Sequence, residues 1–194
     1  MNRNARVLLS SLVAAAVLLA PTGAGASDQN IAVATNVTDG TGVVDASVDF
    51  RVAANGVVDE ENVAYAAASC VDCQAVAAAF QIVLVTRDYD TFVPYNEAFG
   101  ANVACDRCLS WASAKQIIVV SDGAASLTGA GHQRMRALEE SIEAIQPDLP
   151  GMSLTEVQAV LNAAFAELLD IAQTEIRRTD GGPQDAEVVA SLSS

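Results

Sequence analysis

Cys70-Val71-Asp72-Cys73 and Cys105-Asp106-Arg107-Cys108 begin two versions of one sequence pattern, thirty-five positions apart. The first leads into an apolar run that ends in Gln81-Ile82-Val83-Leu84-Val85, and the second into a run that ends in Gln116-Ile117-Ile118-Val119-Val120. All four cysteines of the chain lie in this duplicated C-x-x-C unit. The duplication, within residues 62–120, therefore decides the fold.

Working outward, the pattern extends to an N-terminal unit that has no cysteine. Asn30-Ile31-Ala32 resembles Asn62-Val63-Ala64 and Asn96-Glu97-Ala98, and Thr38-Asp39-Gly40-Thr41-Gly42 occupies the position of the C-x-x-C. A repeat of 32–35 residues indicates one supersecondary element made three times. Because the first unit makes its turn without sulfur, the cysteines are predicted to pin a turn rather than to perform a reaction.

The local signals favour a β-hairpin in each unit. Asp39-Gly40 between two apolar runs is typical of a hairpin turn. Alanine-rich runs such as Gln74–Ala79 suit a helix by propensity, but the period-two placement of apolar residues favours strands, as at Val76, Ala78, Phe80, Ile82 and Leu84. We predict an α+β fold in which three repeated β-hairpins form an antiparallel sheet, followed by a C-terminal antiparallel helical pair.

The C-terminal third of the chain carries two helical patterns. Met135, Leu138 and Ile142 recur at helical spacing, and Ser153 with Glu156 forms a capping box for a second helix. We predict a repeated β-hairpin region with two C-x-x-C turns at residues 27–126, a helical hairpin packed on the sheet at 127–178, and a flexible tail at 179–194.

The N-terminus is typical of a secretory signal peptide over residues 1–26. Arg3 and Arg6 precede an apolar run, and Ala24-Gly25-Ala26 suits signal peptidase. We therefore predict a secreted chain with no membrane association after cleavage. The 24 acidic and 10 basic residues give a net charge of −14, which disfavours nucleic acid as a partner because phosphates are repelled.

Two C-x-x-C pairs have three physical uses. In an oxidising compartment they favour structural disulfides, and the spacing leaves three pairings open among Cys70, Cys73, Cys105 and Cys108. The same four thiolates could bind zinc, although their separation exceeds that of a compact zinc ribbon. Redox catalysis is the weakest option, because a redox C-x-x-C should begin a helix. The prediction is a disulfide role, with zinc as the alternative cofactor.

We identify no catalytic constellation in the sequence. His132 is the only histidine, and His132-Gln133-Arg134-Met135-Arg136 is not the H-E-x-x-H of a zinc protease. A triad would need His132 as well. Asn36-Val37-Thr38 is a formal glycosylation sequon that we interpret as part of the first turn. The chain is predicted not to be an enzyme.

These motifs together resemble a group of poorly characterised secreted or surface-exposed actinobacterial proteins. The resembling region occurs in chains labelled putative peptide zinc metalloproteases, and it covers roughly residues 30–176 here. The matching residues are Asn62, Cys70, Cys73, Phe80, Gln81, Ile82, Cys105, Cys108 and Gln116. The membrane-embedded protease part and its zinc motif are missing from this sequence, so the resemblance implies no protease activity.

The sequence therefore predicts a secreted, non-catalytic structural or interaction domain stabilised by C-x-x-C disulfides. Its expected partner is a second copy, bound through an alanine-rich sheet face, or a cell-surface protein. That face carries Ala64, Ala66 and Ala68, or Ala75, Ala77 and Ala79. Two alternatives stay open: a zinc-binding module that uses the four cysteines, and a thiol–disulfide redox protein.

Overall fold

The structure is a computed structural model that describes residues 29–53, 57–179 and 187–193. The predicted signal peptide, residues 1–26, lies outside the described residues. Within the described part, no helix is both long enough and apolar enough to cross a membrane.

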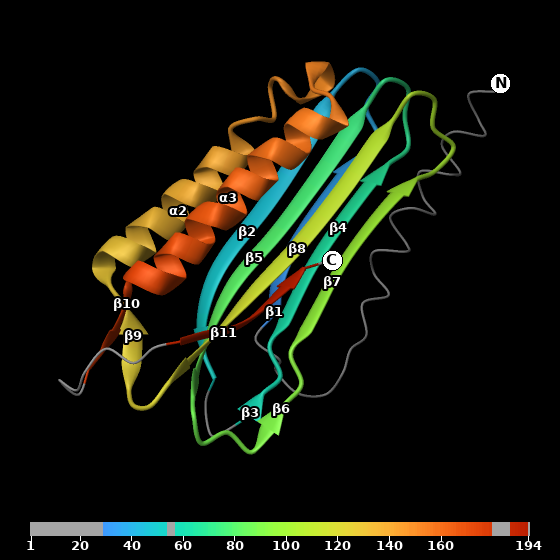
Figure 1. Ribbon diagram of the computed structural model, residues 1–194. Helices are drawn as coiled ribbons and strands as arrows, with labels where there is room; N and C mark the ends of the chain where they lie inside the picture. Colours follow the sequence, from blue (N-terminus) through green and yellow to red (C-terminus); the bar gives the residue numbers. More distant parts are fainter. Residues whose placement is uncertain (1–28, 54–56, 180–186, 194) are drawn as a thin grey trace.

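The three sequence units stack on one another as successive turns of a parallel coil (Figure 1). The first strands of the units form one parallel sheet, called the first sheet: β1 (Gln29–Asn36), β4 (Glu61–Ala68) and β7 (Tyr95–Asn102). The second strands form the second sheet: β2 (Gly42–Val52), β5 (Gln74–Thr86) and β8 (Leu109–Ser121). The short strands β3 (Val57–Val58) and β6 (Thr91–Phe92) also pair in parallel.

The predicted antiparallel sheet of three β-hairpins is therefore wrong. The two strands of one unit do not pair with each other; each pairs with the equivalent strand of the next unit, so that Asn30 lies opposite Asn62 and Asn62 opposite Asn96. The apolar runs carry alanine or larger apolar residues on both faces, a pattern that is typical of parallel strands covered on both sides. The Asp39-Gly40 turn connects two sheets rather than two strands of one sheet.

Alanine fills the space between the two sheets. A buried cluster combines alanines of the first sheet with alanines of the second: Ala32, Ala34, Ala64, Ala66, Ala68, Ala75, Ala77, Ala79 and Ala114. A methyl group fills little space, so such an interior requires the sheets to lie close together. Asn62 of β4 accordingly donates its side-chain amide to the carbonyl of Ala79 in β5 at 3.0 Å. The alanine rows face the interior, and they are not available for the self-association predicted through them.

Two helices cover the outer face of the second sheet (Figure 1). They are α2 (Gly129–Glu143) and α3 (Leu154–Thr174), with the 3-10 turn η1 (Leu149–Gly151) between them, and the capping box at Ser153 and Glu156 forms as the sequence predicts. The large apolar side chains of β5, including Phe80 and Ile82, pack against Leu138, Ile142 and Leu168 of the helices in the main hydrophobic cluster. Arg134 holds the helices antiparallel through Glu167 and Asp170.

The C-terminal segment returns to the coil. β9 (Ala125–Leu127) pairs antiparallel with β10 (Ile176–Arg178), and β11 (Glu187–Ser193) pairs antiparallel with β8. The predicted flexible tail at 179–194 therefore contains a strand that adds to the edge of the second sheet. At the opposite edge, Val44 donates its backbone N–H to Gln146 at 3.0 Å and Val48 donates to Glu139 at 3.3 Å.

Candidate functional site

The turns that join the first sheet to the second stack in register. Gly40 donates its N–H to the carbonyl of Val71 at 2.9 Å, and Asp72 donates to the carbonyl of Asp106 at 2.9 Å. The equivalent positions Gly40, Asp72 and Arg107 all have positive φ, at 70°, 53° and 54°. The Asp39-Gly40 turn and the two C-x-x-C turns are therefore one structural feature, in which the left-handed position is glycine only in the first unit.

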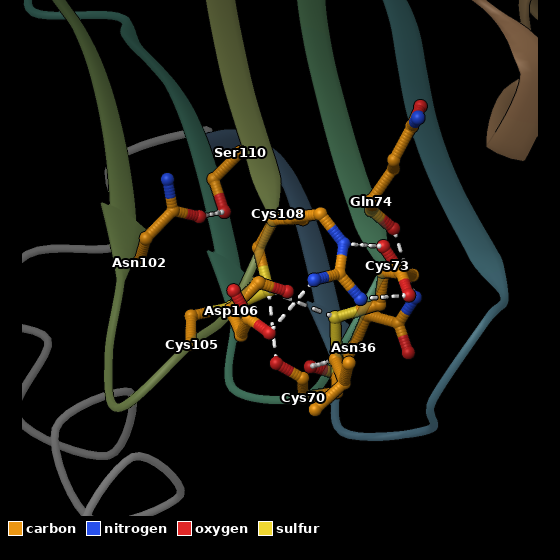
Figure 2. The surroundings of a disulfide bond; sticks show 12 residues. Asn36, Cys70, Cys73, Gln74, Asn102, Cys105, Asp106, Cys108 and Ser110 are labelled. Atoms are coloured by element: carbon orange, nitrogen blue, oxygen red, sulfur yellow. Dashed lines mark hydrogen bonds and ion pairs between the residues drawn. A yellow bond between two sulfur atoms is a disulfide. The ribbon is translucent and has the colours of Figure 1, made fainter.

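Both cysteine pairs are bonded within their own turns, as Cys70–Cys73 and Cys105–Cys108 (Figure 2). Each pair joins Cα atoms 5.9 Å apart, inside the range that a disulfide spans. Cys73 is fully buried and Cys70 nearly so, whereas Cys105 and Cys108 are half-buried in the last turn of the coil. The sulfurs of Cys70, Cys73 and Cys108 lie within 4.8 Å of one another, and we call these three atoms the sulfur cluster.

Charged side chains link the two C-x-x-C turns on the solvent side. Arg107 donates to both carboxylate oxygens of Asp72 in the neighbouring turn, and it also contacts Asp106. The hydrogen bond from Arg107 holds the pKa of the Asp72 carboxyl below its ordinary value. Because these side chains are exposed, the ion pairs contribute little to stability.

An asparagine ladder crosses the interior beside the alanine cluster. Asn30 donates to the side-chain oxygen of Asn62 at 2.7 Å, and Asn62 donates to that of Asn96 at 2.6 Å. In the second sheet, Gln116 donates to the side-chain oxygen of Gln81 at 2.8 Å, and both glutamines are fully buried. The asparagines recur once in each unit and the glutamines in the second and third units, so these amides fix the register of the parallel strands.

No helix or strand of the described residues covers the outer face of the first sheet, whereas α2 and α3 cover that of the second. Its in-register rows place Ile31 beside Val63 and Glu97, and Val33 beside Tyr65 and Phe99. We call this surface the open face; it consists of Gln29, Ile31, Val33, Thr35, Glu61, Val63, Tyr65, Tyr95, Glu97, Phe99 and Ala101. Ile31, Phe99 and Tyr95 are 42%, 51% and 47% exposed.

Two aromatic rings stack on one another in the open face. Tyr65 and Phe99 have ring centroids 5.5 Å apart and an interplanar angle of 18°. Two carboxylates lie toward one end of the face, where Tyr95 donates its hydroxyl to Glu97, which raises the pKa of Tyr95. The face thus combines apolar side chains with a small acidic margin.

The other sequence candidates lie apart from these sites. His132 is exposed near the start of α2, and its ring meets the edge of Phe50 with centroids 6.0 Å apart. The sequon residue Asn36 is 1% exposed and donates to the carbonyls of Thr41 and Gln74, so its side chain is occupied in the turn. Among the described residues, the sulfur cluster is the one group of potential metal ligands that converges.

No family model, curated protein or solved structure matches this chain. The resemblance to secreted actinobacterial proteins therefore stays a prediction, and function has to be argued from the geometry of the chain itself.

Sequence reasoning located the cysteine turns but missed two features. The asparagine ladder had a signal, since Asn30, Asn62 and Asn96 recur at the same place in each unit. The open face had a weaker sequence signal. Its large residues alternate with the alanines of the first strands, and this alternation indicates a strand with two different faces. It does not indicate which of the two faces is covered.

Proposed function

We propose that the chain is an exported, non-catalytic interaction domain that self-associates through the open face. One observation carries the proposal: the helices cover the outer face of the second sheet, whereas the open face leaves Ile31 and Val33 of β1 and Phe99 of β7 exposed, on either side of β4 in the same in-register sheet. Contiguous exposed apolar surface marks an interaction site more often than isolated apolar residues do.

The shape and composition of the open face support a second copy as the occupant. Side chains of three parallel strands, one per unit, form its rows, and two such faces can pack sheet on sheet. Both copies carry Glu61 and Glu97 on this face, and residues 27–194 contain 24 acidic and only 8 basic residues. Association must therefore overcome like-charge repulsion, which salt screens. The proposal predicts that dimerisation strengthens with added salt.

Export and disulfide bonding belong to the same proposal. Two bonded cysteine pairs suit an oxidising compartment, and the residues of the predicted signal peptide precede β1. In this role the disulfides stabilise the turns of a small domain, and the open face makes the contact.

The test is sedimentation equilibrium of the mature chain, residues 27–194, at several concentrations in 50 and 500 mM NaCl. Phe99→Ser should weaken association at least tenfold, because Phe99 is half-exposed and its ring stacks on Tyr65 of the central strand β4. Phe92→Ser is the matched control, since Phe92 is 42% exposed but lies in β6, outside the open face. A strictly monomeric chain at both salt concentrations would contradict self-association and leave a different protein as the partner.

A zinc-binding module is the second candidate, and the sulfur cluster is the observation that favours it. In the reduced chain, Cys70, Cys73 and Cys108 would supply three thiolates, and water or Cys105 the fourth ligand of a tetrahedral site. Native mass spectrometry of the reduced chain with one equivalent of zinc tests it. Binding that survives Cys105→Ser and is lost in Cys108→Ser would support zinc; no uptake by the reduced chain would exclude it.

A further inference from the structure

The two disulfides are in contact with each other. The Sγ atoms of Cys73 and Cys108, which belong to different disulfides, lie 3.4 Å apart. Cys108 Sγ also lies 3.1 Å from the carbonyl oxygen of Cys70. Cys105 is the one cysteine outside the sulfur cluster. Of the half-exposed pair, Cys108 therefore points toward the buried pair and Cys105 does not.

The backbone allows a different pairing of the same cysteines. Gln74 lies opposite Leu109, and Val71 bridges Asp106, so the strand register places Cys73 opposite Cys108. Neighbouring strands are about 4.8 Å apart, and a disulfide spans Cα separations of about 4.4–6.8 Å. A bond from Cys73 to Cys108 would thus fit the stacked turns without rearrangement of the coil.

The two disulfides differ in how accessible they are to a thiol from solution. Cys70 and Cys73 are 6% and 0% exposed, whereas Cys105 and Cys108 are half-buried in the last turn. An external thiol reaches the Cys105–Cys108 bond first. The buried bond is reached only through the sulfur that touches it, which is Cys108.

We propose that Cys108 and Cys73 form a thiol–disulfide exchange site that passes reducing equivalents from the exposed disulfide to the buried one. A small thiolate attacks Sγ of Cys105, forms a mixed disulfide with it and releases Cys108 as a thiolate. Cys108 then attacks Sγ of Cys73; the Cys73–Cys108 bond forms, the Cys70–Cys73 bond breaks, and Cys70 leaves as a thiolate that takes a proton from water. A second thiol releases Cys105, so that two thiols are oxidised to one disulfide and the protein gains two thiols.

The exchange changes what the disulfide joins. Cys70–Cys73 and Cys105–Cys108 each close a turn of four residues, whereas Cys73–Cys108 links the second unit to the third. A bond that closes a longer loop restricts the unfolded chain more. When the surroundings become reducing, the site would therefore replace two disulfides within turns by one disulfide between units.

Two single variants test the proposal without any reductant. In Cys105→Ser the free thiol of Cys108 faces the Cys70–Cys73 bond, and exchange with it should give Cys73–Cys108 and a free Cys70. In the control, Cys108→Ser, the free thiol of Cys105 lies outside the sulfur cluster, and Cys70–Cys73 should stay intact. Alkylation, proteolysis and peptide mass mapping identify the thiols and bonds, with circular dichroism to check that both variants are folded.

The rate of exchange in Cys105→Ser should fall about tenfold for each pH unit below 8, because the thiolate is the attacking species. The proposal is overturned if Cys105→Ser keeps Cys70–Cys73 with Cys108 free, or if Cys108→Ser exchanges equally well. If either variant fails to fold, the wild-type chain is treated with half an equivalent of dithiothreitol and its thiols are mapped in the same way. Free thiols at Cys70 and Cys105 would support the proposal. Free thiols at Cys105 and Cys108, with the Cys70–Cys73 bond retained, would contradict it. Neither result depends on self-association.

Discussion

The two outer faces of the coil are built alike, but α2 and α3 pack on only one of them. Each belongs to a parallel sheet of three stacked units with apolar residues pointing outward. On the second sheet, Phe80 and Ile82 are fully buried beneath α2 and α3. On the first sheet, Val33 and Phe99 remain 36% and 51% exposed. One face therefore stabilises the fold, whereas the other leaves apolar side chains exposed among the described residues.

The largest expected effect comes from the same substitution made on each face. Phe80→Ala removes a fully buried ring that contacts Phe165 of α3, with centroids 6.3 Å apart, and should cost about 3–5 kcal/mol of unfolding free energy. Phe99→Ala removes a half-exposed ring and should cost less than about 1 kcal/mol in the dilute monomer. Urea denaturation followed by circular dichroism measures both. Equal losses of unfolding free energy would contradict this difference between the faces, because they would mean that the open face also stabilises the fold.

The asparagine ladder sharpens the comparison, since it lies between the two sheets rather than on either outer face. Asn62→Ala removes the middle amide, including its bond to the carbonyl of Ala79, and leaves that buried carbonyl without this partner. The expected loss is about 1–3 kcal/mol, the usual range for an unsatisfied buried polar group. Thr35→Ala on the open face, where the side chain is exposed, should change the unfolding free energy by less than about 0.5 kcal/mol. A neutral Asn62→Ala would show that the ladder does not set the register.

A smaller effect is expected where α2 meets the edge of the second sheet. Glu139 accepts the N–H of Val48, while burial and the nearby Glu143, Asp45 and Asp49 raise the pKa of its carboxyl above the ordinary value of 4.5. A raised pKa means that this group favours the folded state below its ordinary value, and that this contribution is lost as the pH rises through the folded value.

Glu139→Gln should therefore raise Tm by about 1–3 °C at pH 7, because the amide oxygen can still accept from Val48 but carries no charge. The gain should disappear below about pH 4, where the wild-type carboxyl is protonated. Glu140→Gln, at the exposed neighbouring position, is the control and should show neither effect. A lower Tm at pH 7 would mean that the charged form of Glu139 is the stabilising one.

Part of this architecture was predictable from the sequence. The threefold repeat, the equivalence of the Asp39-Gly40 turn with the C-x-x-C turns, and the capping box at Ser153 were all readable from local patterns. Strand direction was not. A turn between two apolar runs looks the same whether it joins strands within one sheet or strands in two sheets, and the distinction depends on pairing between units about 34 residues apart.

The candidate site was predictable to a similar extent. The spacing of each C-x-x-C permits a bond within the turn, but the contact between Cys73 and Cys108 follows from the parallel register that local patterns did not reveal. The alanine rows were recognised as a surface of close approach, and the surface they approach is the opposite sheet rather than another molecule. Which apolar face stays open depends on where α2 and α3 pack, a tertiary fact that the repeats themselves do not encode.

Self-association through the open face is tested most directly by sedimentation equilibrium of residues 27–194, beside the Phe99→Ser and Phe92→Ser variants, in 500 mM NaCl. We expect a concentration-dependent dimer for the wild type and for Phe92→Ser, and a monomer for Phe99→Ser across the same concentrations. A wild-type monomer, or a dimer that survives Phe99→Ser unchanged, would contradict the assignment of the open face as the self-association surface.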